Sequence, residues 1–204
     1  MLSRYSSCIA LAPLAFWAFQ VWLHGQIVNK RFEELRGLAN PVERPAALDA
    51  VRRMGGDATP ILLTWSKATP EGMDSHQLKV GLAEAFGGLR APEAIPFLAE
   101  NLLLSRTVNG NHWLKAEYVI ERRLPSVGAL IAIGPRAAEY LIGRMQLFTD
   151  PEERARAVFV IARVADDPSE PFLRATATSG SSLERRYALR GLARIASQGG
   201  PRPR

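Results

Sequence analysis

The chain has 204 residues, of which 47% are hydrophobic and 23% are charged, a composition that supports a substantial core and excludes disorder over most of its length. Its formal net charge of +6 keeps anionic partners such as nucleic acid or lipid head groups open, although an arginine-rich composition can also reflect genomic base composition. Its single cysteine, Cys8, excludes a disulfide framework and a cysteine-rich metal site.

The N-terminal part carries a membrane signal. Residues 8–23 read CIALAPLAFWAFQVWL, and counted from residue 5 the apolar run nearly reaches the roughly 20 residues that a spanning helix needs. Bulky residues, among them Trp17 and Trp22, stand where a signal-peptide cleavage site needs small ones. We therefore expect residues 5–23 to form an uncleaved membrane anchor, with a cleaved signal peptide and a buried first helix as the alternatives.

The orientation of this anchor is weakly specified, because positive charge lies on both sides of the apolar run. By analogy with export signals, we expect a membrane-anchored protein whose body lies outside the cytoplasm, in the periplasm of a bacterium. Secretion after cleavage and a body on the cytoplasmic face are the alternatives. A short connecting helix is expected after the anchor, broken at Asn40 and Pro41.

Apolar residues at helical spacing predict a series of helical pairs from residue 45 onward. The period lengthens after the polar loop at 105–111, since 44 residues separate Leu89 from Ile133, and an insertion is expected there. Capping residues and glycine or proline stops delimit the helices, with Asp74 at the start of one of them. The predicted helices span residues 45–54, 57–67, 76–89, 112–124, 152–165, 168–177 and 183–196, with further helices around 95–102, 127–133 and 137–145.

The stretch from residue 150 to 196 contains one helical pattern twice. Arg154 and Arg163 recur 31 residues later as Arg185 and Arg194, together with the apolar positions of the same helix. Each copy begins with a capping residue three positions before a Glu, which is a helix-start signal. A fixed period in this range is typical of solenoids, in which each helical pair buries its apolar face against its neighbours.

Two motifs resemble HEAT repeats of the short bacterial, PBS-lyase-like type. Residues 150–154 read DPEER before an alanine-rich helix, and residues 131–135 read IAIGP before the helix at 137–142. The resemblance covers about residues 45–196 and implies an all-α HEAT-like solenoid of about four helical pairs plus a terminal helix. It says little about activity, because similar repeats occur in scaffolds, lyases, adaptors and nucleic-acid-binding proteins.

The whole chain is therefore expected to comprise four segments. They are a membrane anchor or signal at 1–25, a connecting helix or linker at 26–44, a HEAT-like repeat domain at 45–197 and a disordered tail at 198–204.

The sequence shows no pattern typical of an enzyme. His24, His76 and His112 are scattered, and no helix carries a His-Glu or His-x-x-x-His pair, so no metal site is expected. No strand is predicted, no glycine-rich loop follows one, and no serine sits in a nucleophile elbow. We expect a protein without catalytic activity and without a cofactor.

Arginines at equivalent repeat positions form the first candidate binding surface. Stacked repeats would align them into rows able to grip phosphates or an acidic protein. The alternative, which we favour, is that they bond across repeats and keep the terminal helix soluble. The residues of these basic rows are Arg154, Arg163, Arg185, Arg186, Arg190 and Arg194.

Two further candidate surfaces concern protein partners. In the insertion, Trp113 beside His112 is either a contact anchor or part of a local core. In the resembled repeats the second helices line the concave face, where this chain carries charges of mixed sign, which suit a protein better than nucleic acid. The residues there are Glu93, Glu100, Arg136, Glu139, Arg144, Glu170 and Arg174.

These features predict a non-enzymatic scaffold or adaptor, held at a membrane, that binds a protein partner along the concave face. One alternative is a nucleic-acid-binding HEAT-like protein that uses the arginine rows. The other is a lyase-like or chaperone-like HEAT subunit.

Overall fold

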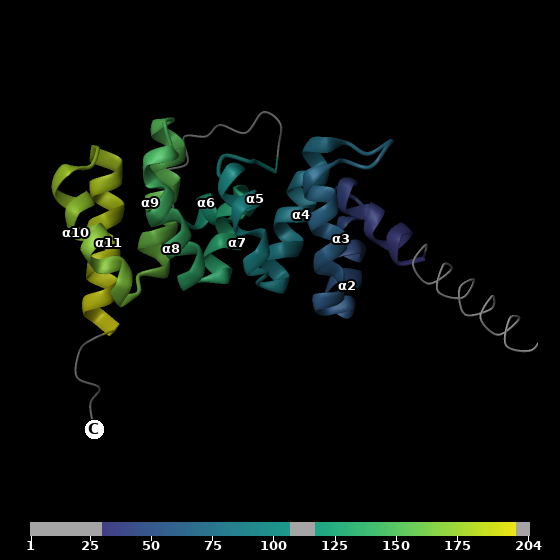
Figure 1. The fold of residues 1–204 in the computed structure, drawn as a ribbon, viewed down its shortest axis with the longest axis horizontal. Coiled ribbons are helices and arrows are strands. Elements are labelled where there is room, and N and C mark those ends of the chain that lie inside the picture. Colours follow the sequence, from purple (N-terminus) through teal and green to yellow (C-terminus); the bar gives the residue numbers. More distant parts are fainter. Residues whose placement is uncertain (1–29, 107–116, 199–204) are drawn as a thin grey trace, which may run out of the picture.

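The computed structural model describes residues 30–106 and 117–198, and all regular structure within these ranges is helical, without a β-strand (Figure 1). The predicted all-α class is confirmed. Residues 30–36 are helical and continue into a 3₁₀ turn, Gly37–Ala39. The helices that follow are α2 (Arg44–Met54), α3 (Thr59–Lys67), α4 (Ser75–Leu89), α5 (Ile95–Glu100), α6 (Glu117–Arg123), α7 (Pro125–Ile133), α8 (Pro135–Arg144), α9 (Pro151–Val164), α10 (Glu170–Ser179) and α11 (Ser182–Gln198).

Side-chain caps determine where three of these helices begin. The Asp74 carboxylate accepts a hydrogen bond from the Gln77 backbone N–H at the start of α4, at 2.9 Å. The Asp150 carboxylate accepts from two backbone N–H groups in the first turn of α9. Before α11, the Ser181 N–H donates to the Glu184 carboxylate at 2.6 Å and the Glu184 N–H donates to the Ser181 hydroxyl at 3.3 Å. The last pair is a reciprocal capping box, and the predicted helix starts are confirmed.

Helices contact partners that lie close to them in the chain. One row contains α2, α4, α7, α9 and α11, each packed against the next. Beside it, α3 packs on α4, α5 on α7, α8 on α9 and α10 on α11. The two ends of the molecule are therefore formed by the two ends of the described chain, with α10 and α11 at one end and α2, α3 and residues 30–36 at the other (Figure 1).

Small residues allow the helices of the row to approach closely. A Cβ atom added at Gly87 of α4 would lie 3.0 Å from the Cα of Ala129 in α7. One added at Gly191 of α11 would lie 2.9 Å from the Cα of Ala162 in α9. Real Cβ atoms do not approach a backbone carbon so closely, so only glycine fits at Gly191 without a shift of the helices.

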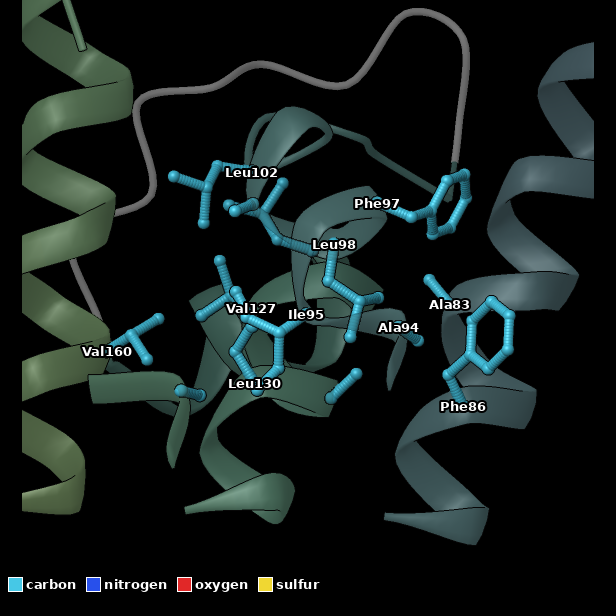
Figure 2. Packing of buried hydrophobic residues seen from close by; sticks show 14 of the residues in the cluster. Ala83, Phe86, Ala94, Ile95, Phe97, Leu98, Leu102, Val127, Leu130 and Val160 are labelled. Carbon is cyan, nitrogen blue, oxygen red and sulfur yellow. The ribbon is translucent and has the colours of Figure 1, made fainter. Parts of the chain in front are cut away.

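Large apolar side chains fill the space between the row and the second helices. Figure 2 shows Phe86 of α4, Phe97 and Leu98 of α5 and Leu130 of α7 gathered between their helices. The rings of Phe86 and Phe97 meet edge to face at 5.8 Å between centroids, a favourable aromatic geometry.

The segment expected to be a connecting helix packs into this same core. Leu35 and Leu38 are fully buried, and the ring of Phe32 meets that of Trp65 in α3 edge to face at 5.0 Å. Residues 30–39 therefore close the first end of the helical stack.

The prediction of a membrane-held protein is wrong as far as the described residues go. No helix within 30–106 or 117–198 is long and apolar enough to cross a membrane. The longest of them, α11, has 17 residues and carries several charged side chains, whereas a span needs about 20 mostly apolar residues. The apolar run at 5–23, like the expected tail after Gln198, lies outside the described residues.

Candidate functional site

Three of the six arginines of the basic rows bond to other elements of the fold. The Nε of Arg154 donates to the Glu184 carboxylate at 2.8 Å. Arg163 in α9 pairs with Glu121 in α6. The Nη1 of Arg194 donates to the carbonyl oxygen of Ala162 at 2.8 Å. These contacts favour the interpretation that the rows stabilise the stacking of helices.

The other members of the rows differ in their surroundings. The guanidinium of Arg186 lies 5.5 Å from the ring centroid of its neighbour Tyr187. Arg185 and Arg190 are exposed on α11. The predicted rows are therefore not uniform, since three of the four repeated positions, Arg154, Arg163 and Arg194, contact other elements while Arg185 is exposed.

The expected protein-binding residues separate into three groups. His112 and Trp113 lie outside the described residues. Glu170 and Arg174 pair with each other along one turn of α10. The remaining positions lie on the 3₁₀ helix η3 (Pro92–Ala94), on α5 and on α8, are exposed, and form no ion pair among the described residues. They are Glu93, Glu100, Arg136, Glu139 and Arg144.

A pocket brings two residues of this last group together. It has a volume of about 280 Å³ and lies between α5, α8, the turn after α8 and the start of α9. We call it the α5–α8 pocket. Its lining residues are Ala99, Glu100, Tyr140, Arg144, Leu147, Phe148 and Glu153.

The α8 wall of the pocket follows from helical spacing. Tyr140 and Arg144 are four residues apart, which places their side chains on one face of the helix. The guanidinium of Arg144 lies 4.9 Å from the Tyr140 ring centroid, a cation–π distance. The Tyr140 ring therefore lies against Arg144, the only cation among the described residues that line the pocket.

The apolar part of the pocket is formed by the 3₁₀ turn Met145–Leu147 and the residue after it. Met145 is buried, and its carbonyl oxygen accepts a 3.5 Å hydrogen bond from Arg154 Nη1. Leu147 is 68% exposed, while Phe148 is partly buried against the core. The turn thus presents one large aliphatic side chain to solvent beside a core aromatic.

Two carboxylates complete the lining. Glu100 is the last residue of α5, and Glu153 lies in the first turn of α9. Within the described part of the chain neither carboxylate has a cation within 4.0 Å. Burial, and then the charge of nearby Asp150, raise the pKa of Glu153 above its ordinary value. The pocket therefore combines apolar contact area with unpaired negative charge.

A second pocket, of about 580 Å³, is rich in arginine. Its lining includes Arg106, Val119, Arg122 and Arg123. Arg106 pairs with Glu84 of α4 at 2.8 Å, so one of the three cations is already neutralised. This cluster was not predicted, because its members come from the polar loop that begins at residue 105 and from α6, which are separated in the sequence.

The sequence analysis also missed five lining residues of the α5–α8 pocket, namely Ala99, Tyr140, Leu147, Phe148 and Glu153. Two features of the sequence could have identified some of them. Tyr140 and Arg144 are four residues apart on a predicted helix, and Leu147 and Phe148 are adjacent apolar residues outside any helical period. Glu153 was interpreted only as part of a helix start.

Within the ranges that the structure covers, no three His, Cys, Asp or Glu side chains lie close enough to hold a metal ion. In comparisons with known proteins, no family model matches the chain and no curated protein sequence matches it significantly.

Proposed function

We propose that this protein is a HEAT-like α-solenoid that acts as a non-enzymatic interaction module and binds a segment of a partner protein in the α5–α8 pocket. The solenoid interpretation is supported by the order of the helix contacts, in which α2, α4, α7, α9 and α11 follow one another. In solenoids each unit contacts only its neighbours, and the second helices line a surface that is free to bind partners.

The observation that carries the proposal is the exposure of Leu147 inside a pocket. A large aliphatic side chain that is 68% exposed stands beside Phe148 and Ala99, while polar groups surround it. Fully burying a leucine side chain is worth roughly 1.5–3 kcal/mol, so a partner side chain that covers Leu147 gains a useful part of its binding free energy there.

The arginine rows give less support to nucleic-acid binding. Arg154, Arg163 and Arg194 contact other parts of the fold, so their charges are not free to neutralise phosphates. A protein partner is therefore the better-supported ligand class.

Selection from a displayed library of random peptides tests the proposal with the full chain as the target. Peptides that are enriched should bind the wild-type chain and lose about tenfold or more in affinity for Leu147→Ser, because the apolar contact is removed. Isothermal titration measures each affinity.

Leu189→Ser is the matched control, since Leu189 is 58% exposed on α11 and does not line the pocket. It should leave the affinity unchanged. A library that yields no peptide, or peptides that bind Leu147→Ser as tightly as wild type, would contradict the proposal.

A further inference from the structure

The lining charges of the α5–α8 pocket indicate which partner segment it accepts, an inference that rests on the function proposed above. Glu100 and Glu153 come from two different helices, α5 and α9, and line the same small space. Neither has a cation within 4.0 Å in the described part of the chain. Asp150 adds a third negative charge close to Glu153.

Arg144, the cation that lines the pocket, forms no ion pair with Glu100 or Glu153. Arg144 lines the pocket, but its guanidinium lies over the Tyr140 ring, at 4.9 Å from the centroid. An acidic residue of a partner would meet Glu100, Glu153 and the nearby Asp150 when it approached Arg144. A basic residue would instead gain two carboxylate partners, so charge complementarity favours a cation.

The apolar residues limit the partner further. Leu147 and Phe148 lie in the same pocket as the two carboxylates, so a segment that fills it must bring an apolar side chain close to its charged one. Lysine and arginine also bury their aliphatic stems along apolar surface while the charged head reaches a carboxylate.

We propose that the α5–α8 pocket binds a protein segment that carries a lysine or arginine next to an apolar side chain. The cation lies between Glu100 and Glu153, and the apolar side chain covers Leu147 and Phe148. Tyr140 and Arg144 form the remaining wall and restrict the direction in which the segment crosses the pocket.

The peptides selected on the full chain provide the test. Replacing the lysine or arginine of a selected peptide by glutamine should weaken binding to the wild-type chain by roughly 5- to 10-fold. The same replacement should have no effect on binding to the double variant Glu100→Gln/Glu153→Gln, because the charge pair is already lost there. Glu139→Gln is the control, since Glu139 is exposed on α8 and does not line the pocket. The glutamine replacement in the peptide should weaken binding to this variant as much as it weakens binding to the wild-type chain.

Salt provides a measurement that needs no variant. Raising the salt concentration from about 0.05 to 0.5 M should weaken the wild-type complex, because a partly exposed charge pair is screened. Affinity that does not change with salt, selected peptides without a basic residue, or equal binding to wild type and the double variant would overturn the inference. If one of these results is obtained but the selected peptides still bind Leu147→Ser more weakly than wild type, the proposed function stands and only the requirement for a basic residue fails. If the selected peptides bind Leu147→Ser as tightly as wild type, the proposed function fails as well.

Discussion

Single charged residues in this protein join helices that are far apart in the sequence. Glu184 is buried at the start of α11, where it caps its own helix through Ser181 and pairs with Arg154 of α9 at 2.8 Å. Burial raises its pKa, but the hydrogen bonds from Ser181 and from Arg154 outweigh that effect, so the pKa lies below its ordinary value. The ionised carboxylate therefore stabilises the folded state.

We predict that Glu184→Gln lowers the free energy of unfolding at pH 7 by about 1–3 kcal/mol, because a buried charge-assisted contact is lost. A depressed carboxyl pKa stabilises the fold above the pKa of the unfolded chain, and that contribution disappears as the pH falls through the folded pKa. The difference between variant and wild type should therefore shrink toward pH 3. Urea unfolding at both pH values measures it.

Glu139→Gln serves as the comparison for this prediction, since Glu139 is exposed on α8 and forms no ion pair among the described residues. It should change stability by less than about 0.5 kcal/mol. A Glu184→Gln chain as stable as Glu139→Gln at pH 7 would show that the link between α9 and α11 is unimportant.

At the scale of the elements, the distance between helices of the row is set by glycine and alanine. Ala162 in α9 and Gly191 in α11 meet where a Cβ on Gly191 would lie 2.9 Å from both the Ala162 Cα and the Leu173 Cδ1. Alanine is the better helix former by about 1 kcal/mol, but here its methyl group would have to push two helices apart.

We predict that Gly191→Ala destabilises the protein by about 1–3 kcal/mol, since overpacking outweighs helix propensity. Gly88→Ala in α4 should be neutral or slightly stabilising, because a Cβ at Gly88 meets nothing within 4 Å. Thermal unfolding of both variants compares the two effects. A stabilising Gly191→Ala would mean that α9 and α11 do not pack as closely as described.

Local signals were sufficient to predict most of the elements. Asp74, Asp150 and Ser181 were identified as helix starts because their side chains cap backbone N–H groups that are adjacent in the sequence. The predicted ends of two helices, residues 89 and 165, also agree to within one residue with the observed ends of α4 and α9, Leu89 and Val164. The residues that follow these ends, Arg90 and Ala165, adopt positive φ angles of 51° and 46° without being glycine, which is the usual residue at such caps.

The pocket could be predicted only in part. Glu100 and Arg144 were expected on the exposed face of second helices, which follows from helical periodicity. The exposure of Leu147 depends on the 3₁₀ turn after α8, and the approach of Glu153 to Glu100 depends on how α9 packs near α5. The approach of Glu153 to Glu100 is a tertiary effect, because about 50 positions separate the two residues, and sequence periodicity does not contain it.

At the scale of the whole molecule, the helices pack mainly against partners that lie close to them in the chain, and α5 and α8 leave an exposed surface that includes Glu100, Glu139 and Arg144. The α5–α8 pocket is the part of that surface where exposed apolar area and unpaired charge coincide. Partner binding at this pocket is the function that we propose for the protein. It can be followed in the intact chain, whose mass of 22.4 kDa suits methyl-detected NMR.

The most direct measurement is the change in leucine methyl resonances of the full chain when a selected peptide is added. Leu147 and Leu189 are both exposed, so one spectrum contains the pocket and its control. Binding in the pocket predicts that the Leu147 methyl signals shift to saturation while those of Leu189 stay in place. Shifts confined to Leu189, or no shift at Leu147 at saturating peptide, would contradict the account.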